Sequence, residues 1–87
     1  MSKLSMEDFS KRTKFSKKLA DVESFITWRY VSMHYFDRKP VWVTERICGK
    51  SHDGNTVDFT DEEKEILKGA LVDMADRLRR TADALNF

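Results

Sequence analysis

The positions of proline and glycine constrain this fold more than any other feature of the sequence. The chain has one proline, Pro40, and three glycines that all follow it, so the first 39 residues contain neither residue type. Proline and glycine interrupt helices more strongly than other residues do. We therefore expect a long helix in the first part of the chain. It should end near Asp37 or Arg38, because the residue before a proline disfavours the helical conformation.

Capping residues indicate where this first helix begins. Ser5 fits an N-cap, with Asp8 at the N3 position of the following turn. These residues predict a helix over about residues 6–37. A second capping candidate, Ser16, leaves open an interruption of the helix around residues 13–16.

The apolar residues of this helix recur at intervals of three and four, as on one face of an amphipathic helix. Trp28, Val31 and Tyr35 project from the opposite side of the same helix. A helix that is apolar on two sides needs to be covered on both. We expect a homo-oligomer with these three residues at its interface, since a pair of helices this small rarely stands alone. The first face consists of Phe15, Leu19, Val22, Ile26, Tyr30 and Met33.

The clearest local signal lies at the start of the last helix. Thr60 and Glu63 have the spacing of a capping box, and acidic residues fill the first turn, where the helix dipole favours them. We expect a helix from Asp61 to about Leu85. Its apolar residues form a single continuous stripe along one face. That stripe consists of Leu67, Ala70, Leu71, Met74, Leu78, Ala82 and Leu85.

Two further features of the last helix lead to expectations. Gly69 costs about 1 kcal/mol relative to alanine inside a helix, which suggests that another backbone approaches closely there. Asp73 and Arg77 lie four residues apart, and this spacing predicts that they pair across one turn of an exposed face.

The segment between the two helices is rich in β-branched residues. Residues 41–48 contain two valines, a threonine and an isoleucine, and Asp53-Gly54 follows as a typical turn. We interpret residues 40–59 as a short β-hairpin or an irregular segment. The alternative is a short helix that begins at Pro40 and ends before Gly49, since proline favours the first helical position and glycine the position after the last.

Together these elements predict one mainly α-helical domain over residues 1–87, with an α+β fold as the alternative. Two long antiparallel helices flank a short hairpin or irregular segment. A chain of this length buries only roughly 60–65% of the surface that its unfolded form exposes, so we expect a thin core.

Cysteine content and hydropathy indicate the compartment. The single cysteine, Cys48, cannot form an internal disulfide, and the sequence has neither a signal-like start nor a run of roughly 20 apolar residues. We expect a cytoplasmic protein without membrane contact.

The net charge is only +1, but basic residues concentrate in residues 1–19 and acidic residues in residues 53–66. Such asymmetry suits a nucleic acid, an acidic partner, or pairing of the chain's own ends.

Catalytic and metal-binding motifs are missing from the sequence. It contains no glycine-rich phosphate loop, no pair of cysteines and no Gly-x-Ser-x-Gly motif. The dipeptide His52-Asp53 resembles that of metal-dependent phosphohydrolases, but those enzymes need further His and Asp ligands, and Asp53-Gly54 is ordinary turn chemistry. We expect no enzymatic activity, no metal and no cofactor.

Aromatic and basic residues alternate between Trp28 and Arg46. Such residues are enriched where proteins bind one another tightly, and they also bind nucleotides by stacking and phosphate neutralisation. We predict a binding protein that docks on a larger protein partner and modulates or inhibits it, in the manner of small accessory proteins of mobile elements. The alternative is binding of nucleic acid or nucleotide. The candidate binding residues are Trp28, Arg29, Tyr35, Arg38, Lys39, Trp42 and Arg46.

Overall fold

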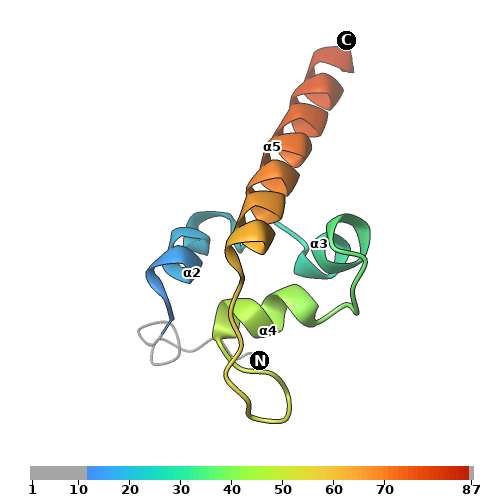
Figure 1. The fold of residues 1–87 in the computed structure, drawn as a ribbon. Helices are drawn as coiled ribbons and strands as arrows, with labels where there is room; N and C mark the ends of the chain where they lie inside the picture. Colours follow the sequence, from blue (N-terminus) through green and yellow to red (C-terminus); the bar gives the residue numbers. More distant parts are fainter. Residues whose placement is uncertain (1–11, 87) are drawn as a thin grey trace.

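The computed structural model describes residues 12–86, and this range is mainly helical (Figure 1). Its elements in chain order are α2 (Lys14–Lys18), the short 3-10 helix η1 (Ala20–Val22), α3 (Trp28–Tyr35), α4 (Trp42–Cys48) and α5 (Asp61–Ala84). The described range contains no β-strand, and a single antiparallel bridge joins Lys50 to Thr56. The predicted mainly α-helical class is therefore confirmed for these residues.

Three short elements, α2, η1 and α3, replace the predicted first helix. The prediction of one continuous helix over residues 6–37 is wrong within the described range, while its start and the Ser5 cap lie outside that range. Thr13 caps α2, because its Oγ1 accepts a hydrogen bond from the backbone N–H of Ser16 at 3.1 Å. Ser16 is thus the partner of a cap and not the cap itself.

Contacts with α4 explain why the first helix is broken. The hydroxyl of Ser16 donates to the carbonyl of Ile47 at 2.7 Å, and the hydroxyl of Ser32 accepts from the N–H of Val43 at 3.0 Å. In a continuous helix the two serines would lie roughly 24 Å apart, whereas their partners on α4 are about 6 Å apart along the helix axis. The chain must therefore fold back between the serines, and the loop before α3 allows it to do so.

Residues 42–48 form the helix α4, so the predicted β-strand is wrong there and the helical alternative is confirmed. Gly49 ends the helix with a φ of 88°, in the left-handed region that glycine adopts without strain. Pro40 precedes the helix and does not occupy its first position. Burial outweighs the β propensity of this segment, because Val43 and Ile47 lie one turn apart and are both fully covered.

The loop after α4 contains the predicted turn. The N–H of Gly54 donates to the carbonyl of Ser51 at 3.0 Å, and the N–H of Ser51 donates to the carbonyl of Asn55 at 2.9 Å. Gly54 has a φ of 90°, which again favours glycine. The turn at Asp53-Gly54 is confirmed, but the segments on either side of it do not extend into strands.

The helix α5 begins with the predicted capping box. The hydroxyl of Thr60 accepts from the N–H of Glu63 at 3.1 Å, and the Glu63 carboxylate accepts from the N–H of Thr60 at 2.9 Å. The predicted bounds of this helix are confirmed to within one residue. The close approach expected at Gly69 is wrong, because no neighbouring atom of the described chain lies within 4 Å of the position that a β-carbon would take.

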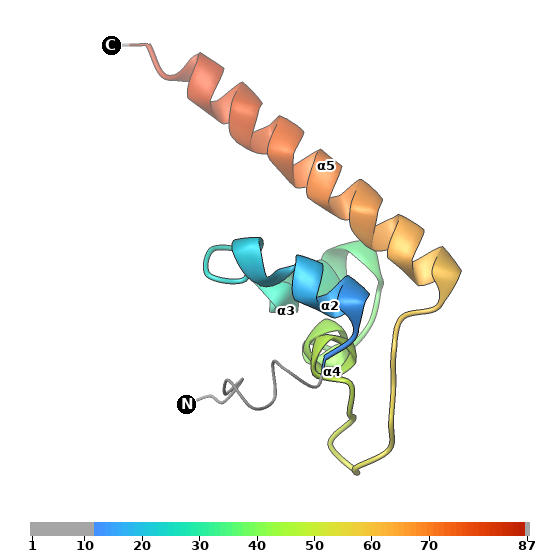
Figure 2. The same cartoon turned by 90° about the vertical axis from the view of Figure 1, so that its left-hand side faces the viewer.

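The short helices form a small body, and α5 crosses it and projects beyond it (Figures 1 and 2). Since α5 is the only long helix among the described residues, the predicted antiparallel pair of long helices is wrong. None of the described helices combines the length and the hydropathy that a membrane span requires. The core between the body and the first half of α5 consists of Leu19, Val31, Trp42, Val43, Ile47, Phe59 and Leu67.

Candidate functional site

The seven predicted binding residues lie on α3, on α4 and on the connection between these helices. This connection reverses the chain direction at Asp37, which has a φ of 55°, and the N–H of Arg38 donates to the carbonyl of Ser32 at 2.9 Å. The reversal brings the end of α3 beside the start of α4. On α3 lie Trp28, Arg29 and Tyr35, on the connection lie Arg38 and Lys39, and on α4 lie Trp42 and Arg46.

Trp42 belongs to the core and supports its neighbours. Only 5% of its surface is exposed, and its ring packs against Phe36 at a centroid distance of 4.6 Å and against Phe59 at 5.9 Å. A ring covered in this way has little surface left for a nucleotide base to stack on. Trp42 therefore serves as a buried support for the side chains that lie over its ring.

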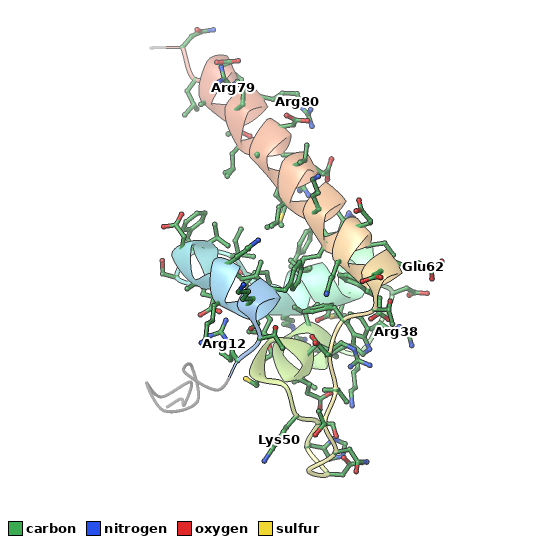
Figure 3. All side chains as sticks on the ribbon, turned by 60° about the vertical axis from the view of Figure 1, so that its left-hand side comes forward. Arg12, Arg38, Lys50, Glu62, Arg79 and Arg80 are labelled. Atoms are coloured by element: carbon green, nitrogen blue, oxygen red, sulfur yellow. The ribbon has the colours of Figure 1, made fainter. Side chains whose placement is uncertain are left out.

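Two guanidinium groups lie over the Trp42 ring. The Arg46 group is centred 4.1 Å from the ring centroid and the Arg38 group 5.4 Å from it, both within the range of a cation–π interaction. Neither arginine pairs with a carboxylate among the described residues, and the buried Nε of Arg46 has no hydrogen-bond partner there. In the view of Figure 3, Arg38 appears toward the Glu62 end of α5, and Arg79 and Arg80 appear at its other end. We call Arg38, Trp42 and Arg46 the arginine cluster.

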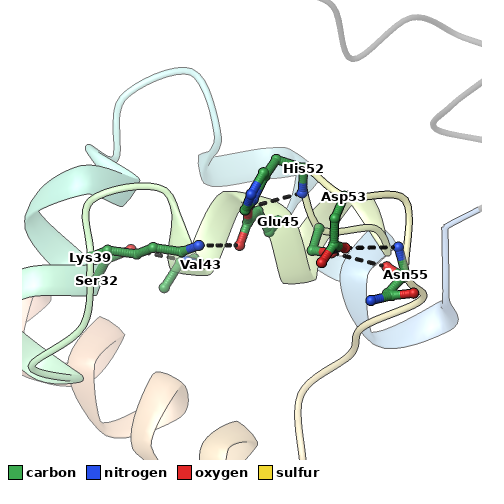
Figure 4. A network of polar contacts seen from close by, with 8 residues as sticks. Ser32, Lys39, Val43, Glu45, His52, Asp53 and Asn55 are labelled. Carbon is green, nitrogen blue, oxygen red and sulfur yellow. Dashed lines mark hydrogen bonds and ion pairs between the residues drawn. The ribbon is translucent and has the colours of Figure 1, made fainter.

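Lys39 is neutralised by a neighbouring carboxylate (Figure 4). Its Nζ lies 3.5 Å from Oε1 of Glu45, whose other oxygen accepts from the backbone N–H of His52 at 3.2 Å. The ring Nδ1 of His52 also lies 3.4 Å from that oxygen. Burial alone would raise the pKa of Glu45, but these hydrogen bonds and the charge of Lys39 outweigh it and lower the pKa. Glu45 thus ties the loop after α4 to the helix.

Tyr35 joins α3 to α5. Its hydroxyl donates to the Asp73 carboxylate at 2.5 Å and lies 3.4 Å from Arg77, which also donates to the hydroxyl of Tyr30 at 2.9 Å. The hydrogen bond to Asp73, followed by burial, raises the pKa of Tyr35 above its ordinary value. Asp73 and Arg77 therefore both contact the hydroxyl of Tyr35 on α3. They do not form the ion pair along α5 that their spacing predicted.

A groove opens between the body and the projecting half of α5. Its volume is about 520 Å³, and Arg77 is one of the residues that line it. One side comes from the loop before α3 and from α3 itself, and the other side comes from α5. The groove is lined by Phe25, Ile26 and Tyr30 on the first side and by Met74, Leu78 and Thr81 on the second.

The other predicted residues lie apart from the arginine cluster. Trp28 is half-buried against the core, and Val31, predicted at an oligomer interface, is fully buried. Val31 therefore cannot contribute to the predicted interface, because it packs inside the protein. Trp28 and Tyr35 are only partly covered, and their place at an interface stays a prediction. Arg29 is exposed and lines a second hollow on the other side of Tyr30.

The sequence reasoning missed the groove because its two sides come from segments about fifty residues apart. One signal pointed toward it: the apolar stripe of α5 continues to Leu85, which is farther than a few short helices can cover. In the structure, Leu78 is 61% exposed and Leu85 is 64% exposed, while Leu67 of the same stripe is completely covered.

Residues 15–85 match the sequence profile of a family described as Domain of unknown function (DUF5053). The chain belongs to this family. The matched range includes α3, α4 and α5, and hence both the arginine cluster and the groove. No curated protein and no solved structure matches the chain.

Proposed function

We propose that this member of the DUF5053 family is a non-catalytic binding protein that docks on a larger protein partner and modulates or inhibits it. It acts as a homo-oligomer, and the arginine cluster is its docking surface. The observation that carries the proposal is the pair of guanidinium groups of Arg38 and Arg46, held on a buried aromatic ring without a carboxylate partner in the described range.

Preorganisation is what makes this pair suitable for docking. An arginine that is already held on an aromatic ring loses less side-chain entropy when it binds than a freely rotating one does. Trp and Arg are also the residue types that dominate binding energy at protein interfaces. A carboxylate-bearing segment of the partner would supply the hydrogen-bond acceptors that Arg38 and Arg46 lack, as a charge-assisted and bidentate contact.

Binding of nucleic acid is the second candidate, because guanidinium groups also neutralise phosphates. Stacking surfaces weigh against it: Trp42 is covered by Phe36 and Phe59, and the hydroxyl of Tyr35 is bonded to α5. The charge of Lys39 is offset by Glu45. These features reduce both the stacking and the number of phosphate contacts that the surface can offer, so they favour a protein partner.

The test of the proposal is affinity capture from a lysate of the organism that encodes the chain. The tagged wild type is compared with Arg38→Ala/Arg46→Ala and with a control, Arg79→Ala/Arg80→Ala, which removes two exposed arginines from the far end of α5. We expect one larger protein to be retained by the wild type and the control and lost from the Arg38/Arg46 variant. Recovery of the same proteins with all three chains would refute the docking surface.

The nucleic-acid alternative has its own test. Fluorescence anisotropy of labelled single- and double-stranded oligonucleotides is followed at low and at physiological salt. The proposal predicts no tight binding at physiological salt. Tight, salt-sensitive binding that Arg38→Glu or Arg46→Glu abolishes would replace the protein partner with a nucleic acid.

A further inference from the structure

We propose that the groove receives the projecting half of α5 from a second copy of this chain, in an antiparallel and two-fold symmetric pairing. This inference deepens the proposed function, because it names the surface through which the homo-oligomer forms. It assigns that surface to α5 and leaves the arginine cluster free for the larger partner.

The first step of the argument is the division of one apolar stripe into a covered and an uncovered part. Leu67 and Ala70 are 0% and 2% exposed, whereas Leu78 and Leu85 on the same face are 61% and 64% exposed. A helix of 24 residues is roughly 36 Å long, and the small body covers only its first half. Contiguous exposed apolar surface of this kind marks a site of association.

The second step is the shape of the groove. The uncovered half of α5 forms one of its sides, and Phe25, 64% exposed, stands on the other. Proteins recognise an amphipathic helix by receiving side chains spaced by three, four and seven residues in an apolar groove. The uncovered half of α5 carries such a set, since Leu78, Ala82 and Leu85 follow one another at these intervals.

The third step is charge. The last turn of α5 contains no basic residue, and it includes Asp83. Arg79 and Arg80 lie one turn earlier, but no ion pair joins either of them to Asp83 in the described range. The Asp83 carboxylate is therefore available to a guanidinium group of a second copy, and the helix dipole adds negative charge at this end. The groove, in turn, contains Arg77, whose guanidinium is held in place by the hydroxyls of Tyr30 and Tyr35.

An antiparallel pairing brings the negative last turn of α5 in each copy close to the Arg77 guanidinium of the other copy. When Leu78 of one copy faces Ala82 of the other, the last turn of each α5 lies close to Arg77 of its neighbour. The two-fold axis makes the second contact identical to the first, as in most homodimers. A parallel pairing would instead place the two Arg77 side chains side by side and align the two helix dipoles unfavourably.

The test is the oligomeric state of the full chain, measured by sedimentation equilibrium. Leu78→Asp places a charge on the uncovered stripe. The matched control is Val72→Asp, which changes a residue of α5 that is also exposed, at 55%, but lies outside the stripe. We expect a dimer for the wild type and for Val72→Asp, and a monomer for Leu78→Asp. Circular dichroism must show equal helix content for all three chains, as expected for changes at exposed positions.

A cross-linking experiment tests the direction of the pairing. In a Cys48→Ser background, Leu78→Cys chains are mixed with Ala82→Cys chains and oxidised. The antiparallel pairing predicts that the mixed disulfide forms faster than either disulfide between identical chains. Preferred cross-linking of Leu78→Cys to itself would overturn the antiparallel arrangement.

The dimer itself is overturned by a monomeric wild type, by a Leu78→Asp variant that remains a dimer, or by a Val72→Asp variant that dissociates equally. None of these results depends on the larger partner. Conversely, the capture experiment with the Arg38→Ala/Arg46→Ala variant can fail without any change in the oligomeric state of the chain. The two proposals can therefore fail separately.

Discussion

The hydroxyl of Ser32 accepts a hydrogen bond of 3.0 Å from the backbone N–H of Val43, and so it caps the start of α4 from a neighbouring helix. The residue at the N-cap position is Val41, whose side chain cannot accept a hydrogen bond. Together with the bond from Ser16 to Ile47, this contact holds α4 between α2 and α3. The arrangement places Trp42, and therefore both arginines, at the end of α3.

We predict that Ser32→Ala destabilises the protein by about 1–3 kcal/mol, because Ser32 is fully buried and its loss leaves the Val43 N–H without a partner. Chemical denaturation followed by circular dichroism measures this difference in the free energy of unfolding. Ser24→Ala is the control, since Ser24 is exposed and its change should stay within about 0.5 kcal/mol. Equal stability of both variants would show that the cap contributes nothing.

A substitution at Gly69 should raise the stability of the protein. We expect Gly69→Ala to stabilise the protein by about 1 kcal/mol, because the added methyl group meets no neighbouring side chain and alanine favours the helix. Thermal unfolding should show a higher midpoint. Gly49→Ala should lower it, since that residue has a φ of 88°. A Gly69→Ala variant that unfolds earlier than the wild type would mean that something packs on this face of α5.

Glu45 makes stability depend on pH. Its folded-state pKa lies below the ordinary value of 4.5, so the carboxylate stabilises the fold above that pH, and the contribution is lost as the pH falls through the folded-state pKa. We predict that Glu45→Gln lowers the free energy of unfolding by about 1 kcal/mol at neutral pH. The difference from the wild type should shrink below about pH 4.5.

Denaturation at a series of pH values tests this prediction. Glu65→Gln, at an exposed position on α5, is the control and should follow the wild type over the same range. A difference between Glu45→Gln and wild type that stays constant down to the lowest pH would contradict the account of the Glu45 contacts.

Tyr35 reports on the contact between α3 and α5. Because its hydrogen bond to Asp73 raises its pKa above 10.0, its phenol should ionise later than an unperturbed tyrosine. The chain has only two tyrosines, so the ultraviolet titration of the wild type minus that of Tyr35→Phe isolates this group. An isolated transition at or below pH 10.0 would show that the hydrogen bond is absent in solution.

The sequence predicted α5 well because the signals for that helix are local. The capping pair Thr60 and Glu63 and the apolar stripe lie within the helix or next to it, so no tertiary contact is needed to recognise them. The break of the first helix depends instead on bonds between Ser16 and Ile47 and between Ser32 and Val43. These contacts cross 31 and 11 residues of sequence, and neither periodicity nor capping reveals them.

The candidate site was predicted in part. The sequence pointed to Arg38, Trp42 and Arg46, and the structure brings these three together. Had the helical alternative for residues 42–48 been preferred, the spacing of Trp42 and Arg46 by one turn would have predicted their contact. The groove could not be predicted, because it forms only when α5 crosses the loop that carries Phe25.

The central claim is that the chain has two separate binding surfaces, the arginine cluster for a larger protein and the stripe of α5 for a second copy of itself. Native mass spectrometry of complexes captured from lysate tests it most directly. We predict that the wild-type complex contains two copies of this chain together with the larger protein. The Arg38→Ala/Arg46→Ala variant should still be recovered as a dimer, but without that protein. A variant that keeps the larger protein, or that loses the dimer along with it, would contradict the separation of the two surfaces.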